Sequence, residues 1–387
     1  MTDKLYYKDS HISEFEAEVI ECRKEKKGFA IILDKTAFFP EGGGQLPDTG
    51  FIGDARVSDV QEKQGEILHY ADREIAEGTS VHCAIDYEQR LRRMQNHSGE
   101  HIVSGITHRL HGYNNVGFHM GEECMTLDFD GELEERDILE IETLANEAVR
   151  DNIPIVATFP QPEELKNIDY RSKLELTHDV RIVTIEGIDC CACCAPHVKR
   201  TGEVGVIKIL EAERHRGGMR LSVVCGMDAL DNYRLRQDSN SAISVLLSSK
   251  RDKTAEAVER LKNERDGYKE RISALSMELI KLKAESYPQS EGNIAVFDDI
   301  LDEVALREFV NLLMEKCSGI AAAFSGSDEK GWRYIIGSKN IDLRKNATAI
   351  NSGIGGRGGG KSAMIQGSAE EKRENIEKFI RNFSACD

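Results

Sequence analysis

Two short stretches determine what this 387-residue chain can be: HSGEH at residues 97–101 and CCAPH at residues 193–197. Each stretch places two metal-ligating side chains four residues apart, which is about one turn of an α-helix. If the fold brings the two pairs together, they supply the nitrogen and sulfur shell that Zn²⁺ prefers. The spacing predicts a zinc site made of His97, His101, Cys193 and His197. A purely structural zinc site is the alternative, because four protein ligands close the shell.

The choice of cysteine ligand rests on spacing. Cys190, Cys191 and Cys194 are competitors for the position, but only Cys193 lies four residues before His197. The chain has ten cysteines in all. With no secretory leader at the polar N-terminus, this count favours thiols and metal ligands over a disulfide framework.

Composition narrows the class of protein. Hydrophobic residues make up 40% of the chain, enough for folded cores, and 387 residues predict two to four domains. No apolar run approaches the ~20 residues that a membrane span needs. We therefore expect a cytoplasmic protein without a membrane segment. The net charge of −17 does not exclude a nucleic-acid partner, because binding a polyanion needs only a local basic surface.

The pattern along the chain predicts an α+β multidomain fold with four parts. Residues 1–87 alternate short strands and turns and predict a small β-barrel with a glycine-rich motif. Residues 88–228 mix helices and strands and hold the four metal ligands. Residues 229–288 predict a helical coiled-coil linker, within one charged helix from about 228 to 285. Residues 289–387 have a compact α/β pattern.

The linker carries a heptad seam. Its apolar side chains recur at alternating three- and four-residue steps, and Arg265 fills one seam position. The seam residues are Val258, Leu261, Tyr268, Ile272, Leu275, Leu279 and Leu282. A short coiled coil or a helical hairpin is one interpretation. An amphipathic helix packed on its own domain is the other.

Two glycine-rich stretches stand outside the metal motifs. In FFPEGGGQLPDTG, residues 38–50, three consecutive glycines allow a backbone to approach a ligand or another domain closely. In GIGGRGGGK, residues 353–361, Arg357 and Lys361 could bind phosphates, and the spacing formally matches a P-loop. No apolar strand leads into this second stretch, so we predict a flexible loop.

These motifs, in this order, resemble the editing half of alanyl-tRNA synthetase and the free-standing alanyl-tRNA editing proteins of the AlaX type, long form. Residues 38–50 are similar to that family's FYPEGGGQxxDTG signature. Residues 93–101 are similar to RMxxHTATH, and residues 193–205 to CGGTHVxxTGEIG. Residues 350–367 resemble the glycine-rich segment of the synthetase's C-terminal, DHH-associated domain. Because the similarity starts near residue 1, the resemblance implies a protein that hydrolyses but does not charge tRNA.

The resemblance implies a Zn²⁺-dependent trans-editing hydrolase. Its expected substrate is Ser-tRNA(Ala), with Gly-tRNA(Ala) as a second candidate, and it should spare Ala-tRNA(Ala). Expected substrate-binding residues are Gln45, His119 and Thr126. Expected tRNA-binding residues are Arg92, Lys199, Arg200, Arg357 and Lys361.

Other readings remain open. No catalytic residue is assigned beyond the zinc ligands. The coiled coil and the C-terminal domain are candidate contacts for a homodimer. The alternatives are a non-catalytic, zinc-stabilised tRNA-binding protein and a metal hydrolase of a small ester or amide.

Overall fold

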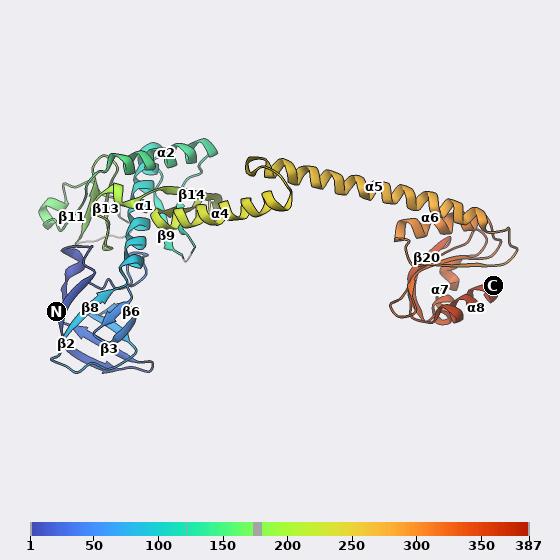
Figure 1. Cartoon of the computed structure of the whole chain (residues 1–387), viewed down its shortest axis with the longest axis horizontal. Coiled ribbons are helices and arrows are strands. Elements are labelled where there is room, and N and C mark those ends of the chain that lie inside the picture. Colours follow the sequence, from blue (N-terminus) through green and yellow to red (C-terminus); the bar gives the residue numbers. More distant parts are fainter. Residues whose placement is uncertain (1, 122, 173–179, 386–387) are drawn as a thin grey trace. The chain divides into compact units, whose positions relative to one another are not determined.

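The computed structural model describes residues 2–121, 123–172 and 180–385. They form two compact units, Met1–Ser241 and Ala242–Asp387 (Figure 1). The predicted α+β multidomain class is confirmed, while the four-part division at residues 87, 228 and 288 stays a prediction. Within the described residues, no helix is long and apolar enough to span a bilayer.

The first unit begins with six antiparallel strands that close into a barrel in the order β2-β3-β7-β6-β5-β8. The strands are β2 (Glu14–Lys24), β3 (Phe29–Leu33), β5 (Gly50–Ile52), β6 (Ala55–Lys63), β7 (Glu66–Ala71) and β8 (Ser80–Ile85). Alternate residues point inward, as the two-residue period of a strand requires, so Ala55 and Val57 are fully buried. A β-bulge between Val57 and Asp59 shifts this alternation by one residue, and Val60 is therefore buried as well. Two short strands, β1 (Asp3–Lys4) and β4 (Lys35–Thr36), pair in parallel beside the barrel. A 3₁₀ turn, η1 (Leu5–Tyr7), follows β1.

The glycine-rich motif of the barrel forms a loop, residues 39–48, which we call the glycine hairpin. At its base the backbone N–H of Asp48 donates to the carbonyl oxygen of Phe39, and the N–H of Phe39 donates to the Asp48 carboxylate. Reciprocal backbone bonds between Gly42 and Gln45 close its tip. Gly43 and Gly44 adopt φ of 60° and 81°, which only glycine adopts readily. The tip therefore turns tightly enough to reach the next domain.

Helix α1 (Tyr87–His111) is the centre of the first unit, and every residue from Met94 to Thr107 is buried. Gly112 ends it in the left-handed conformation at φ 73°. The helix packs on an antiparallel sheet of order β14-β15-β10-β9 and on helix α2 (Glu135–Asp151). The sheet strands are β9 (Asn115–Met120), β10 (Met125–Phe129), β14 (Ile207–His215) and β15 (Gly218–Cys225).

A second, three-stranded sheet of order β11-β12-β13 completes this unit. Its strands are β11 (Ile155–Thr158), β12 (Ile182–Ile185) and β13 (Asp189–Ala192), accompanied by the short helices α3 (Pro162–Leu165) and η2 (Thr201–Val204). Strand β13 contacts α1 and leads directly into Cys193. This sheet thus delivers the second pair of predicted ligands to the helix that carries the first.

The prediction of one helix from about 228 to 285 is wrong. Helix α4 (Gly226–Leu246) ends before a turn, and α5 (Thr254–Ser286) begins after the 3₁₀ turn η3 (Arg251–Lys253). The break falls on the polar run SSKRDK, where Ser248 takes a left-handed φ of 48°. Serine competes for backbone hydrogen bonds and weakens a helix interior.

The second unit holds a five-stranded sheet of order β16-β17-β18-β20-β19. The strands are β16 (Ile294–Asp298), β17 (Ala321–Ser327), β18 (Gly331–Gly337), β19 (Gly356–Lys361) and β20 (Met364–Ala369). One face packs on α6 (Glu303–Met314) and the end of α5, which run side by side in Figure 1. The other face packs on α7 (Leu343–Gly353) and α8 (Arg373–Asn382).

The glycine-rich stretch near residue 357 is not the flexible loop that we predicted. Residues 356–361 are β19, an edge strand paired with β20. A Cβ at Gly358 would lie 2.2 Å from the carbonyl oxygen of Gln366 and 2.4 Å from the Tyr334 hydroxyl. The glycines therefore allow β19 to pack closely on β20. A high glycine content is compatible with either a flexible loop or a closely packed strand, so composition alone did not predict which one forms.

Candidate metal centre

The four predicted ligands converge in the first unit. One donor atom from each of His97, His101, Cys193 and His197 lies within 4.8 Å of all the others. The Cys193 sulfur is 3.5 Å from His97 Nε2 and 3.4 Å from His197 Nε2. The three histidines are 1–4% exposed. The two sequence pairs thus form one buried cluster.

Only one pair uses helical geometry. His97 and His101 lie on α1, one turn apart, as predicted. The second pair was expected on a helix turn as well, and that expectation is wrong, because residues 193–197 form an irregular loop. Arg181 holds this loop, donating from Nη1 to the carbonyl oxygens of Cys193 (2.9 Å) and Ala195 (2.8 Å). Pro196, which has no backbone N–H to donate, explains why a helix turn is unfavourable.

Each histidine is oriented by a partner at its outer nitrogen. His97 Nδ1 lies 3.0 Å from Gln45 Oε1, at the tip of the glycine hairpin. His101 Nδ1 lies 2.8 Å from an oxygen of Asp189. His197 Nδ1 lies 3.0 Å from the Ser98 hydroxyl. With Nδ1 engaged in all three rings, each Nε2 is left for the centre of the cluster, the arrangement typical of histidines that bind metal.

A buried ion pair supports the His101 partner. The guanidinium of Arg171 contacts both Asp189 oxygens, at 2.7 and 3.0 Å. Burial by itself would raise the pKa of Asp189, but its bonds to His101 and Arg171 outweigh burial and lower the pKa to about 2. Asp189 is therefore a carboxylate at neutral pH and fixes the proton of His101 on Nδ1.

The electrostatics favour the metal-binding protonation states at Cys193 and His197. At His101, burial by itself would lower the pKa, but Glu100, Asp189 and Cys193 raise it well above the usual value, so a metal has to displace a proton from this ring. Burial opposes the charged thiolate of Cys193, yet the neighbouring His97 and His197 and the hydrogen bonds from His101 and His197 lower its pKa well below the usual value. Burial lowers the pKa of His197 to about 3, so this ring is neutral at physiological pH. A thiolate and a neutral imidazole are the forms in which these side chains act as ligands.

The donor set fits zinc. Three imidazole nitrogens and one thiolate are ligands that zinc accepts and that Mg²⁺ and Ca²⁺ do not prefer. Zinc–sulfur and zinc–nitrogen bonds of about 2.3 and 2.0–2.1 Å at a tetrahedral angle imply a sulfur–nitrogen separation of about 3.5 Å. The Cys193 sulfur lies 3.4 Å from His197 Nε2 and 3.5 Å from His97 Nε2, which agrees with this separation.

The competing cysteines lie elsewhere. Cys191 joins His101 and Asp189 in a separate group, on the Nδ1 side of the ring, and burial raises its pKa to about 11. Cys190 contacts the Thr184 hydroxyl at 3.7 Å. Cys194 is exposed, and its sulfur would lie 3.2 Å from a Cβ placed on Gly43.

The predicted substrate residues separate into two places. Gln45 is 1% exposed and bonded to His97. His119 and Thr126 pair directly across β9 and β10, so they share a sheet face. The opposite face of β9 carries Phe118, whose ring lies 4.9 Å from His97. We predicted His119 as a substrate contact, but its neighbour Phe118 faces the cluster. Successive side chains of a strand point to opposite faces, so His119 points away from His97.

The predicted tRNA-binding cations are mostly engaged within the protein. Arg92 donates to Asp228 and Asp231, both at 2.8 Å. Lys199 is exposed and pairs with Asp9 at 2.9 Å, and Arg200 is exposed and bonded to the Asn152 carbonyl. Arg357 and Lys361 lie exposed on β19 of the second unit.

Three supporting residues escaped the sequence analysis. Ser98 stands between the helical ligands, and Asp189 lies four residues before Cys193, so both were within sight of the motifs. Arg171 gives no local signal, because it reaches Asp189 only through the pairing of residue 171 with Cys191. Such partners depend on tertiary contacts rather than on spacing.

Three protein families match separate segments of the chain. Residues 2–89 match tRNA synthetases class II (A). Residues 180–221, a segment that includes Cys193 and His197, match the threonyl and alanyl tRNA synthetase second additional domain. Residues 291–386 match the DHHA1 domain.

Whole-chain relatives agree with these segments. The alanyl-tRNA editing protein AlaX-L of Pyrococcus horikoshii is 27% identical over 97% of this chain and 96% of its own length. The alanyl-tRNA editing protein Aarsd1 of Danio rerio is 27% identical, with 97% of each chain covered. An alanine–tRNA ligase of Pyrococcus furiosus is 31% identical over 97% of this chain but only 43% of its own length. The resemblance stated from the motifs is confirmed.

Proposed function

We propose that this chain, a full-length relative of the long-form alanyl-tRNA editing proteins, is an aminoacyl-tRNA deacylase that hydrolyses Ser-tRNA(Ala). Gly-tRNA(Ala) is the second substrate of the proposal, and Ala-tRNA(Ala) is spared. The observation that carries the proposal is the buried cluster of three histidines and Cys193 with a hydrogen-bonded partner behind every ring.

In this proposal His97, His101, Cys193 and His197 hold Zn²⁺. When bound, the zinc supplies a positive charge that orients the aminoacyl ester and assists water. The residues of the chain do the rest. Asp189 and Ser98 keep the rings of His101 and His197 fixed, and Phe118 forms an apolar wall beside His97.

Gln45 is the residue best supported for substrate binding. Its Oε1 accepts from His97 Nδ1, while its Nε2 is buried and has no hydrogen-bond partner among the described residues. An unpaired buried donor costs free energy until a ligand acceptor meets it. A site that hydrogen-bonds a substrate hydroxyl can reject the analogue without that hydroxyl by a factor of ~10⁴ in kcat/KM. We therefore assign recognition of the serine side chain to the Gln45 side of the cluster.

The experiment is a deacylation time course with Ser-, Gly- and Ala-tRNA(Ala). We expect the wild type to hydrolyse the seryl ester and leave the alanyl ester intact, and His101→Ala to lose hydrolysis. Decay of Ser-tRNA(Ala) at the same rate with and without protein would refute editing. Binding of tRNA(Ala) without hydrolysis would identify a non-catalytic binding protein, and hydrolysis of small esters alone a diverged hydrolase.

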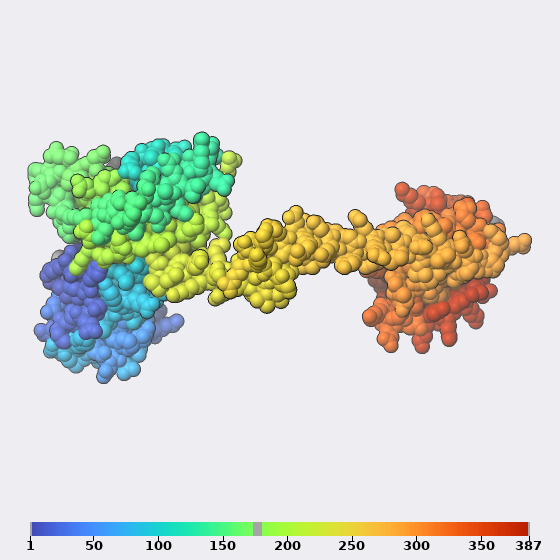
Figure 2. Space-filling model, turned by 45° about the horizontal axis from the view of Figure 1, so that its top comes forward, coloured from blue at the N-terminus to red at the C-terminus, as the bar shows by residue number. Residues whose placement is uncertain are grey.

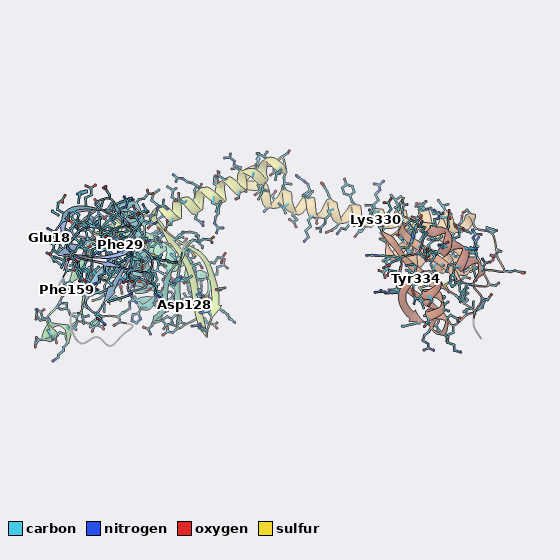
Figure 3. All side chains as sticks on the ribbon, turned by 90° about the horizontal axis from the view of Figure 1, so that it is seen from below. Glu18, Phe29, Asp128, Phe159, Lys330 and Tyr334 are labelled. Atoms are coloured by element: carbon cyan, nitrogen blue, oxygen red, sulfur yellow. The ribbon has the colours of Figure 1, made fainter. Side chains whose placement is uncertain are left out.

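The second unit offers a surface for a further tRNA contact. Arg333, Ser368 and Arg357 form one row across β18, β20 and β19, because Ser368 pairs with both arginines. Both arginines are exposed, and they line a hollow of about 940 Å³. Lys330, labelled with Tyr334 in Figure 3, lines the same hollow. Asp302, Glu303 and Glu370 line the hollow as well, so we assign the phosphates of the tRNA backbone to the exposed arginine row and Lys361 rather than to the hollow as a whole.

The exposed α5 seam supports a homodimer. Its seven apolar side chains are 38–65% exposed, and Figure 2 shows the yellow part of α5 without other atoms of its unit over it. Ile280 and Ala284, on the opposite face, are buried against α6. The helix thus packs on its own unit with one face and leaves the heptad seam for a partner.

The seam composition favours a parallel pair of two copies. Val258 and Ile272 occupy a positions and Leu275 a d position, a combination that in parallel coiled coils favours two helices over three or four. In that arrangement Glu264 at g faces Lys269 at e of the second copy. An antiparallel pair would instead bring lysines at e positions together.

A further inference from the structure

Four aromatic rings lie in contact from the surface of the first unit toward the metal cluster. Phe159 is 49% exposed, and Figure 3 labels it at the outer edge of the unit. Its ring centroid lies 5.3 Å from that of Tyr7, which lies 4.6 Å from Tyr6, and Tyr6 lies 5.5 Å from Phe39. Phe39 is the first residue of the glycine hairpin. We call these four rings the aromatic row.

The middle of the row touches the loop that carries the cysteine ligand. The Arg181 guanidinium lies 5.3 Å over the Tyr7 ring and donates to the carbonyl oxygens of Cys193 and Ala195. The Lys4 ammonium lies 5.8 Å from the same ring. Two cations therefore flank the row where it approaches the cluster.

Unsatisfied donors gather along the row. Among the described residues, five buried side-chain atoms have no hydrogen-bond partner, and three of them belong to this region: Tyr6 Oη, Arg181 Nε and Gln45 Nε2. Tyr6 is 1% and Arg181 7% exposed. Buried polar groups are nearly always hydrogen-bonded, so three orphaned donors in one region indicate a polar ligand.

We propose that the aromatic row binds the unpaired 3′ end of the tRNA, with Phe159 stacking a base and Tyr6 and Arg181 donating hydrogen bonds to ribose or base edges. This inference rests on the proposed function. Proteins bind single-stranded RNA by stacking its bases on aromatic rings beside cations, and the stacking tolerates any sequence. The inner end of the row, Phe39, is the first residue of the hairpin that holds Gln45, so the row connects the exposed Phe159 ring to the loop beside the cluster.

The test measures binding of an RNA minihelix whose unpaired 3′ end carries 2-aminopurine, a base whose fluorescence is quenched by stacking. Phe159→Ala should weaken binding at least about five-fold and abolish the quench, since stacking of one base contributes that much or more. Phe159→Tyr should retain both. Tyr6→Phe keeps the ring but removes one donor, and it should weaken binding about three-fold.

Phe51 provides the matched control. It is 41% exposed and has the Arg56 guanidinium 5.2 Å over its ring, but it has no ring contact with the row. Phe51→Ala should bind the minihelix like the wild type. A blunt minihelix without the unpaired end should bind the wild type and Phe159→Ala equally.

The kinetics separate this inference from the proposed function. With Ser-tRNA(Ala), Phe159→Ala should raise KM and leave kcat unchanged. If the wild type hydrolyses Ser-tRNA(Ala) while Phe159→Ala binds and quenches like it, the row is not the binding site and editing stands. If the wild type fails to hydrolyse but the minihelix results hold, the editing proposal fails and the row remains an RNA site.

Discussion

The side chains of Asp48 and Arg90 form an ion pair that is completely buried between the glycine hairpin and helix α1. Arg90 Nε lies 2.9 Å from both carboxylate oxygens, and Asp48 also accepts from the backbone N–H of Phe39 at 2.6 Å. Both side chains are 0% exposed. Arg90 lies two helical turns before His97, so the same helix holds the hairpin at its base and, through Gln45, at its tip.

Asp48→Asn leaves the charge of Arg90 buried without its partner. We expect the free energy of unfolding to fall by about 3–5 kcal/mol, the usual cost of breaking a buried pair from one side. Urea denaturation followed by circular dichroism measures it. The control is Glu66→Gln, which removes a partner of the exposed Arg23 and should leave the midpoint unchanged. A small effect for Asp48→Asn would show that water reaches Arg90.

Cys193→Ser should abolish stoichiometric zinc binding, because it removes the only sulfur in the four-ligand cluster. Cys190→Ser is the matched control, since the Cys190 sulfur contacts Thr184 instead of the cluster. Plasma mass spectrometry of the purified proteins gives the metal content. Equal zinc in both variants would mean that a neighbouring cysteine supplies the ligand.

The stability of the first unit should decrease with acid because of His69. This ring is fully buried in the barrel, bonded to Thr36 and to the Ile31 carbonyl, and burial lowers its pKa from 6.5 to about 4. The folded pKa lies below the unfolded one, so the unfolded chain binds a proton first. The contribution of His69 to the free energy of unfolding is complete above pH 6.5 and is lost as the pH falls toward 4.

The expected loss between pH 7 and pH 5 is about 2 kcal/mol, from 1.36 kcal/mol per unit of pKa. His69→Gln, which does not titrate, should remove this part of the pH dependence in urea titrations. The control is His82→Gln at an exposed position, and this variant should show the same pH dependence as the wild type. A pH slope that persists in His69→Gln would assign the acid sensitivity to other groups.

Two helical glycines should respond oppositely to alanine. A Cβ at Gly105 of α1 would lie 2.4 Å from the carbonyl oxygen of Ile188, whereas a Cβ at Gly267 of α5 meets nothing within 4 Å. Gly267→Ala should stabilise its helix by about 0.5–1 kcal/mol. Gly105→Ala should lower the melting temperature despite the better helix propensity. Stabilisation by both would mean that β13 can move away from α1.

Arg265 is the polar member of the α5 seam, and such a residue at an a position sets register at a cost in stability. If the chain dimerises through this seam as proposed, Arg265→Ile should tighten the dimer in sedimentation equilibrium, and Leu275→Glu should give monomers. A cysteine introduced at Leu261 should crosslink to itself in a parallel pair. Failure to crosslink in a protein that remains dimeric would contradict the parallel arrangement.

The sequence predicted those parts of the site that depend on local spacing. His97 and His101 share a helix face because four residues make one turn, and Cys193, selected by its spacing to His197, lies in the same cluster. Predictions failed where tertiary contacts override local preference. The loop of Cys193 is held by hydrogen bonds from Arg181 rather than by helical hydrogen bonds. The glycines near Arg357 form an edge strand because residues without a side chain can pair closely with β20.

The His97–Gln45 hydrogen bond would also make the proposed metal binding a reporter of folding across the first unit. One ligand helix is bonded on one side to the barrel, through Gln45 and Asp48, and on the other to β13, through Asp189. A cation held there binds the folded chain in preference to the unfolded one and so links the melting of both parts. Chelation should therefore divide one cooperative unfolding transition into two, with the barrel and the α+β part denaturing independently.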